Sequence, residues 1–199
     1  MKNKICVYIF GLIIGFSKVS GQTVTANCIK TGDFIIEANY GFPYFIGTLV
    51  TALNNSSSGQ GLNLTIHNSN HLGGRFEYVV SKNIGVGLEY TYAAVSIRDN
   101  SSTSGLQYSI IKQRALMRLM IHLLESERGD IYGVFGAGYR VFTVKTNDPA
   151  FILPSIYNIV PVASRLGFGF RVFITPVIGL HAEIGIGGPL VQGGVSIKF

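Results

Sequence analysis

The residues with the clearest potential for chemistry are His67 and Ser69, which are separated by Asn68. A histidine base and a serine hydroxyl are the residue types of nucleophilic hydrolysis, in which the base removes the hydroxyl proton. The pair falls in a polar segment, 45–70, that we expect to form a long loop, and no carboxylate lies nearby in sequence to orient the histidine. We therefore interpret the pair as part of a solvated loop and predict no catalytic residue.

No other set of residues has the spacing of a metal or cofactor site. Histidine, cysteine and carboxylate residues do not recur at the spacings of metal ligands. Gly133, Gly136 and Gly138 lack the G-x-G-x-x-G spacing of a phosphate-binding turn and fall within a predicted strand. His122 and His181 are expected to be hydrogen-bonded histidines in the interior. The sequence therefore predicts neither a metal nor a cofactor.

The composition indicates one folded domain with few charges. Of the 199 residues, 47% are hydrophobic and 13% are charged, whereas about 25% are charged in a typical soluble domain. Two cysteines are too few for a disulfide scaffold. Three of the 16 basic residues lie in the first 21 positions, so removal of that segment leaves 13 basic against 10 acidic residues. Such a small excess gives no reason to expect a nucleic-acid partner.

The N-terminus has the three parts of a secretory signal peptide. A basic start at 1–4 precedes an apolar run over 5–16, and Val19-Ser20-Gly21 supplies small residues before a cleavage site at Gln22. The apolar run is too short to span a bilayer as a helix. We predict a signal peptide over 1–21, a short N-terminal segment over 22–32 and one exported domain over 33–199.

Alternation with a period of two residues, which is typical of β-strands, recurs along the exported domain. In 84–92, for example, Ile84, Val86 and Leu88 share one face and Glu89 lies on the other. Short connections at about 82–83, 124–129 and 174–175 alternate with long polar ones over 45–70, 98–105 and 145–159. Tight turns at one end and long loops at the other favour an up-and-down meander. The pattern predicts eight strands, at about 33–44, 71–81, 84–97, 106–123, 130–144, 160–173, 176–187 and 190–199.

The charges of these strands share one phase, which predicts what surrounds the sheet. A charge facing lipid costs about 2–4 kcal/mol at the bilayer midplane, whereas charges inside a closed barrel can pair with one another. Closure also satisfies the backbone polar groups of the edge strands in a membrane. A soluble sandwich with charged patches is the alternative, but it does not explain the single phase. The predicted interior charges are Glu37, Arg75, Glu77, Glu89, Lys112, Arg114, Arg118, Arg140, Arg165, Arg171, His181, Glu183 and Lys198.

The C-terminal strand resembles that of bacterial outer-membrane barrels. The aromatic Phe199 ends an alternating apolar series with Val191, Val195 and Ile197. In that family this pattern is the signal read by the barrel-assembly machinery. The resemblance covers about 33–199 and is to the small barrels typified by the OmpA transmembrane domain and OmpX. It implies an all-β, eight-stranded antiparallel up-and-down transmembrane barrel, a monomer in the bacterial outer membrane with membrane lipid and the assembly machinery as partners.

Three functions are compatible with these features. The first is a structural or surface-interaction protein whose external loops, chiefly 45–70, contact an extracellular or periplasmic partner. The second is an enzyme that modifies lipid A, because some small outer-membrane barrels use a lipid-facing His-x-Ser pair with an acidic partner, here His67 and Ser69. The third is a narrow channel or a component of a secretion machine, although eight strands enclose room only for side chains or one small ligand. We expect the first.

Overall fold

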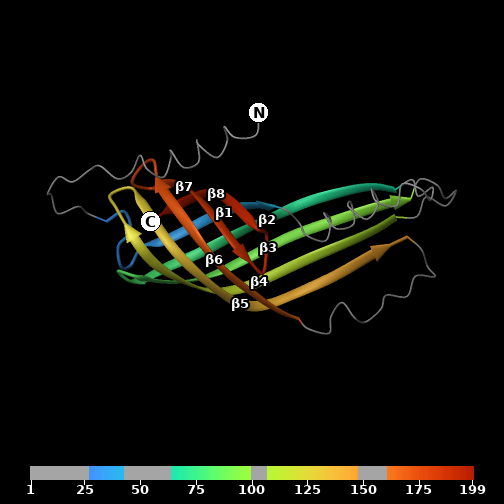
Figure 1. Ribbon diagram of the computed structural model, residues 1–199, viewed down its shortest axis with the longest axis horizontal. Coiled ribbons are helices and arrows are strands. Elements are labelled where there is room, and N and C mark those ends of the chain that lie inside the picture. The colour runs from blue at the N-terminus through green and yellow to red at the C-terminus, as the bar shows by residue number, and fades with distance from the viewer. Residues whose placement is uncertain (1–26, 43–63, 100–106, 148–160) are drawn as a thin grey trace, which may run out of the picture.

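The eight strands close into one antiparallel barrel (Figure 1), as the alternation predicted. The computed structural model describes residues 27–42, 64–99, 107–147 and 161–199. Pairing of the first strand with the last closes the sheet, from Phe42 opposite Val191 to Ile35 opposite Lys198. The strands are β1 Phe34–Phe42, β2 Leu64–Ser81, β3 Ile84–Asp99, β4 Gln107–Glu125, β5 Gly129–Thr146, β6 Val162–Phe173, β7 Ile178–Ile186 and β8 Val191–Lys198.

Burial alternates along the strands because successive side chains point to opposite faces. In β1 and β6 every second residue is buried and the residues between are exposed. The exposed set is almost wholly apolar and includes Leu88, Phe168 and Ile184, each with more than half of its surface exposed. The buried set contains the charged residues. The prediction that the charges line the interior is therefore confirmed.

Strands β2 to β5 are longer than the others and extend beyond them at one end of the barrel (Figure 1). Gly41, near the end of β1, pairs with His71, and the first residue of β6, Val162, pairs with Tyr139. Residues 64–70, 94–99, 107–111 and 143–146 therefore form a wall above the rest of the barrel, called the overhang below. The opposite end is the turn end, where 82–83, 126–128 and 174–177 join the strands.

The second strand begins earlier than the sequence pattern indicated. The alternation predicted a start at 71 and a loop over 45–70, but β2 begins at Leu64. A register shift lies between Ser69 and Leu72, which pair with Ala94 and Tyr92 respectively. One extra residue in this bulge changes the phase, so that a search for unbroken alternation stops there.

Residues 27–32, the described part of the N-terminal segment, pack against the turn end of the barrel. Cys28 and Ile29 are buried and pack in one cluster with Ile35, Val79 and Phe173. The amide of Cys28 donates to the carbonyl of Ser126 at 2.9 Å, and the Lys198 ammonium donates to the carbonyl of Cys28. The apolar contacts and these hydrogen bonds hold the segment across the opening.

Within the described ranges, no helix has the length and the apolar character needed to cross a bilayer.

Candidate functional site

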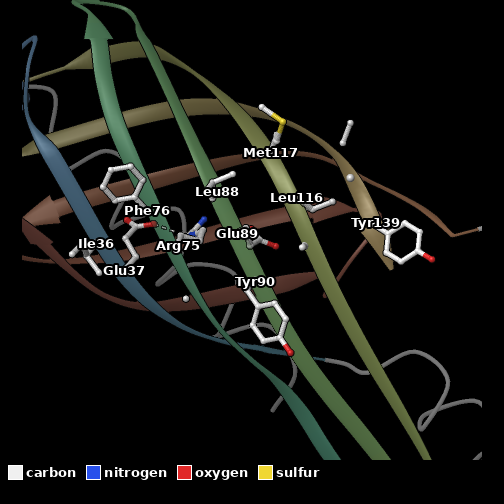
Figure 2. Close-up of a pocket in the computed structure, with 14 residues that line it drawn as sticks. Ile36, Glu37, Arg75, Phe76, Leu88, Glu89, Tyr90, Leu116, Met117 and Tyr139 are labelled. Carbon is white, nitrogen blue, oxygen red and sulfur yellow. Dashed lines mark ion pairs between the residues drawn. The ribbon is translucent and has the colours of Figure 1, made fainter. Parts of the chain in front are cut away.

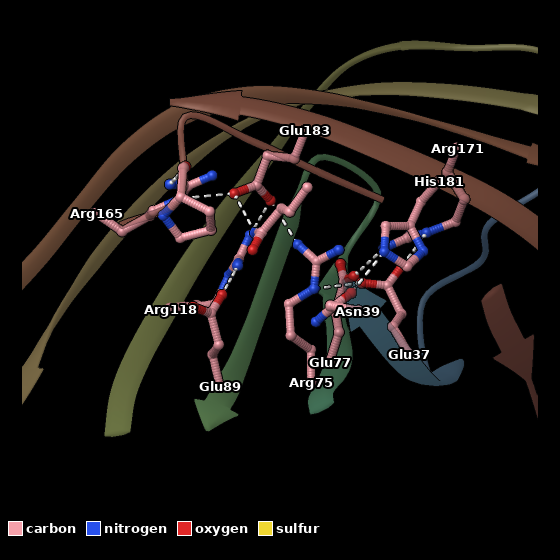
Figure 3. Close-up of polar contacts among 12 residues, drawn as sticks. Glu37, Asn39, Arg75, Glu77, Glu89, Arg118, Arg165, Arg171, His181 and Glu183 are labelled. Atoms are coloured by element: carbon pink, nitrogen blue, oxygen red, sulfur yellow. Dashed lines mark hydrogen bonds and ion pairs between the residues drawn. The ribbon is translucent and has the colours of Figure 1, made fainter. Parts of the chain in front are cut away.

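The interior of the barrel is filled by charged side chains that pair with one another (Figure 3). Each of these residues is at most 5% exposed, so water contributes little to their solvation and the charges must be satisfied by partners. Five carboxylates and five arginines form the ion pairs. They are Glu37, Glu77, Glu89, Asp130 and Glu183 with Arg75, Arg114, Arg118, Arg165 and Arg171.

A first group, the turn-end cluster, is built around Arg171 on β6. Its guanidinium contacts Glu37 at 2.9 Å, Glu77 at 2.7 Å and Asp130 at 3.3 Å, so three strands converge on one cation. His122 lies between two of these carboxylates, 3.1 Å from Glu77 and 3.0 Å from Asp130. A fork of donors surrounded by carboxylates is the geometry for which arginine is suited.

A second group, the loop-end cluster, is built around two glutamates. Glu183 on β7 accepts from Arg118 at 2.5 Å, from Arg165 at 2.8 Å and from the amide of Gln192 at 2.8 Å. Glu89 on β3 pairs with Arg114 and Arg118 of the neighbouring strand. Arg118 therefore joins the two glutamates across the lumen.

Arg75 connects the two clusters. Its Nε lies 2.8 Å from Glu37 and its Nη1 lies 2.5 Å from Glu183. Figure 3 shows its guanidinium between these two carboxylates. The ion pairs consequently form one continuous network along the interior, and its five carboxylates balance its five arginines.

His181 belongs to the hydrogen-bonded periphery of this network. Its Nε2 lies 2.6 Å from Asn39 Oδ1 and its Nδ1 lies 2.9 Å from Ser196 Oγ. Ser196 in turn donates to Glu37 at 2.7 Å. These hydrogen bonds connect β1, β7 and β8 beside the ion pairs.

The structure brings most of the predicted interior residues together. Glu37, Arg75, Glu77, Glu89, Arg114, Arg118, Arg165, Arg171 and Glu183 share the ion pairs, and His181 joins by hydrogen bonds. Lys112 is the exception, because no carboxylate of the described residues lies within ion-pair distance of it. Arg140 is likewise outside the network. Lys198 faces the turn end and lies 3.8 Å from Asp33.

Sequence reasoning missed Asp130, Asn39, Gln192 and Ser196. All four are buried and contact members of the network. Asp130 is two residues before Tyr132, which is also buried, so an extension of the β5 phase to its first residues indicates an inward carboxylate. The three neutral residues carry no signal beyond their phase.

The predicted insertion residues lie on the exterior. Val195, Ile197 and Phe199 are exposed and Val191 is half-buried. The backbone of Phe199 exchanges hydrogen bonds of 2.8 and 3.1 Å with Phe34, so the chain terminus is paired with the first strand. These side chains are thus free to contact lipid while the backbone remains satisfied.

A groove of about 620 Å³ runs over the exterior of β1 to β5 (Figure 2). Its rim includes Leu88, Tyr90, Met117 and Tyr139. Glu37, Arg75 and Glu89 also line it, but each is at most 5% exposed and forms its ion pairs on the inner side. The groove is therefore a feature of the apolar outer wall and does not open a path into the charged interior.

His67 and Ser69 are not in a loop. Both lie on β2 within the overhang, opposite Ser96 and Ala94, and His67 is exposed. This corrects the predicted loop at 45–70 for residues 64–70, whereas its first part lies outside the described residues. The strand placement puts the pair in a regular backbone, but the two positions opposite it carry no carboxylate.

The comparisons with known proteins concern the fold. The sequence matches no model of a protein family and has no match among curated proteins. Solved structures do match: a de novo designed transmembrane β-barrel has a TM-score of 0.48 at 14% identity over 86% of this chain and 98% of its own. Outer membrane protein W of E. coli has a TM-score of 0.46 at 15% identity, over 85% of this chain and 99% of its own. OprG of Pseudomonas aeruginosa has a TM-score of 0.45 at 14% identity, over 85% of this chain and 97% of its own. The likeness is one of fold, at identities of 14–15%.

Proposed function

We propose that the chain is an exported outer-membrane barrel that conducts no ions and acts as a structural or surface-interaction protein. One observation carries this proposal: the ion-pair network is continuous from Asp130 at the turn end to Arg165 near the loop end. A permeating ion would have to separate buried pairs, each of which costs several kcal/mol to break. The N-terminal segment packed around Cys28 adds a second barrier. Export requires the signal peptide predicted over 1–21.

The contact surface in this proposal is the loop end. The outer face of the barrel is apolar as far as Tyr90 and Leu72, but the outer face of the overhang carries polar side chains. Ser96 and Ser109 lie 3.2 Å apart there, and Arg98 and Lys145 are exposed. A change from apolar to polar along the same strands supports a membrane boundary below the overhang. The overhang would then meet the external medium, as would the long polar connections that the sequence predicts beyond it.

This proposal assigns no catalysis to His67 and Ser69. A histidine base in a hydrolase is oriented by a third group, usually a carboxylate. The residues opposite the pair are Ser96 and Ala94, which supply none. Mass analysis of lipid A from cells that express the protein tests this point: we expect the same mass distribution with wild type, with His67→Ala and without the protein. A loss of acyl chains with wild type alone would assign the enzyme function.

Planar-bilayer recording of the refolded full chain tests the central claim. We expect no conductance steps above the bare membrane in 1 M KCl, a condition chosen for the assay. Incorporation is verified separately in vesicles by resistance of the barrel to protease. An Arg75→Ala variant removes the side chain that joins the two clusters. It is recorded beside the wild type, because loss of this side chain is the change most able to open an ion path through the network. Regular ohmic steps with the wild-type protein would contradict the proposal.

A further inference from the structure

Two cations of the interior have no carboxylate partner among the residues that the structure describes. The ion pairs use equal numbers of carboxylates and arginines, but Lys112 and Arg140 also point inward. Lys112 pairs in register with Ala93, whose side chain is fully buried, and Arg140 pairs with the buried Arg114. Among the described residues none offers either cation a carboxylate within ion-pair distance. The excess positive charge is therefore confined to the loop end of the lumen.

These cations are placed against one another by the sheet. Arg114 and Arg140 are direct cross-strand partners, and like charges in that position destabilise a sheet. Lys112 is two residues before Arg114 and therefore on the same face. Lys112 and Arg140 both lie over the Phe142 ring, 5.8 and 5.6 Å from its centre. We call Lys112, Arg114 and Arg140 the cation cluster.

Buried donors near this cluster lack acceptors. Arg114 Nε and Arg165 Nη2 have no hydrogen-bond partner, although each residue is only 2% exposed. Arg140 Nε is also buried without a partner. Nη1 of Arg114 and Nη1 of Arg165 donate to the carbonyls of Gly187 and Pro189 in the β7–β8 turn. Nη2 of Arg114 and Nε of Arg165 pair with Glu89 and Glu183, so both guanidinium groups are fixed. A buried guanidinium N–H without an acceptor has lost the hydrogen bond that it made to water, so these donors favour a bound acceptor at the cluster.

We propose that the cation cluster binds the phosphate or sulfate monoester of a soluble ligand, with Arg165 Nη2 as a further donor. Such esters carry up to two negative charges and three acceptor oxygens, which match several guanidinium donors at once. The β4–β5 wall separates these inward side chains from the membrane, which favours a soluble source over a lipid headgroup. The inference rests on the proposed function, because a soluble ligand reaches the cluster from outside only if the loop end faces the medium.

Calorimetric titration with inositol hexakisphosphate tests the proposal on the refolded full chain in a neutral detergent at physiological salt. We expect saturable binding to wild type. The double variant Lys112→Gln/Arg140→Gln should bind with lower affinity, by about tenfold for each cation removed. The matched control is Arg98→Gln/Lys145→Gln, which removes the same charge from exposed positions of the overhang. The control should bind like wild type. Titration into nanodiscs with and without phosphatidylglycerol separates a lipid source from a soluble one.

A second measurement distinguishes a binding role from a structural one. Because the cations of the cluster repel one another, Lys112→Gln/Arg140→Gln should melt at a higher temperature than wild type without ligand, and the ligand should raise its melting temperature less. Absence of saturable binding to wild type, equal weakening in the control, or binding that requires phosphatidylglycerol would each overturn the proposal. A lower melting temperature of the cluster variant would assign these cations to stability instead. None of these results depends on conductance, so the proposed closed barrel is judged separately.

Discussion

Replacement of Glu183 by glutamine should be among the most damaging single changes in the barrel. The variant keeps the shape of the side chain but removes a buried charge that is paired with Arg75, Arg118 and Arg165. Arg75 retains Glu37 and Arg118 retains Glu89, whereas Arg165 is left with the carbonyl of Pro189. Loss of one partner of a buried pair costs about 3–5 kcal/mol. We expect Glu183→Gln to lower the unfolding free energy by that amount.

Urea titration of the barrel refolded into phospholipid vesicles measures this loss. The chain has no tryptophan, so the folded fraction is followed by the faster migration of unheated barrel on gels. The control is Ile184→Leu, at the next position of the same strand and exposed to lipid, which should cost less than about 1.5 kcal/mol. Glu183→Gln/Arg165→Gln removes the arginine that has lost its carboxylate, and it should recover part of the loss through a coupling of about 0.5–3 kcal/mol.

The reasoning is refuted if Glu183→Gln costs no more than Ile184→Leu. That result would mean that the three arginines are satisfied by water, and the interior would then be hydrated rather than filled by its ion pairs. An additive double variant would show instead that Arg165 does not depend on Glu183.

Three further predictions concern other parts of the barrel. Leu88 is 57% exposed on the outer wall, so Leu88→Arg should destabilise the barrel in lipid by about 2–4 kcal/mol. The control Leu88→Ile should leave the stability unchanged. An equal effect of both variants would mean that this face does not contact lipid. Phe199→Asp should reduce assembly into the outer membrane and leave unfolded chain in the periplasm, and fractionation with normal membrane levels would contradict the C-terminal resemblance. Burial raises the pKa of the Cys28 thiol to about 11, so maleimide labelling at pH 8 should be slow in the folded barrel and fast in urea. The folded thiol keeps its proton to higher pH than the unfolded thiol does. Its contribution to stability is therefore complete below the ordinary thiol pKa and is lost as the pH rises toward 11. Rapid labelling of the folded protein would show that Cys28 is accessible.

The fold was predictable from the sequence because a membrane barrel imposes one rule on every strand. Apolar residues must face lipid and charged residues must face inward, so the period of two is visible in each strand without homologous sequences. The rule fails where the backbone departs from it. Residues 64–70 were predicted as a loop because they belong to a long polar segment, and the bulge between Ser69 and Leu72 breaks the alternation that would have joined them to β2.

The candidate site was predictable only as a set of inward charges. Phase indicates that Glu183 faces inward, but the choice among its arginines depends on the stagger between strands, which the sequence does not specify. Asp130 shares the inward phase of Tyr132, so extension of the β5 alternation to the first residues of the strand would have identified it. Lys112 faces inward as predicted, but no carboxylate of the described residues forms an ion pair with it. Inward direction and pairing are separate properties, and phase determines only the first.

The connectivity of the ion-pair network has a consequence for the order in which the barrel folds. Glu37 is 134 residues from Arg171 and 159 residues from Ser196, and Arg75 is 108 residues from Glu183. Contacts between such distant segments form late, after local hairpins are complete. Pairs between neighbouring strands, such as Glu89 with Arg114, can form within a hairpin. Until β1 meets β8, however, Arg171 and Glu183 lack most of their partners, and water must solvate these charges. These charges therefore lose their water and pair when β1 pairs with β8. A sheet that has not yet closed keeps a hydrated, charged face, and that face opposes its transfer into hydrocarbon.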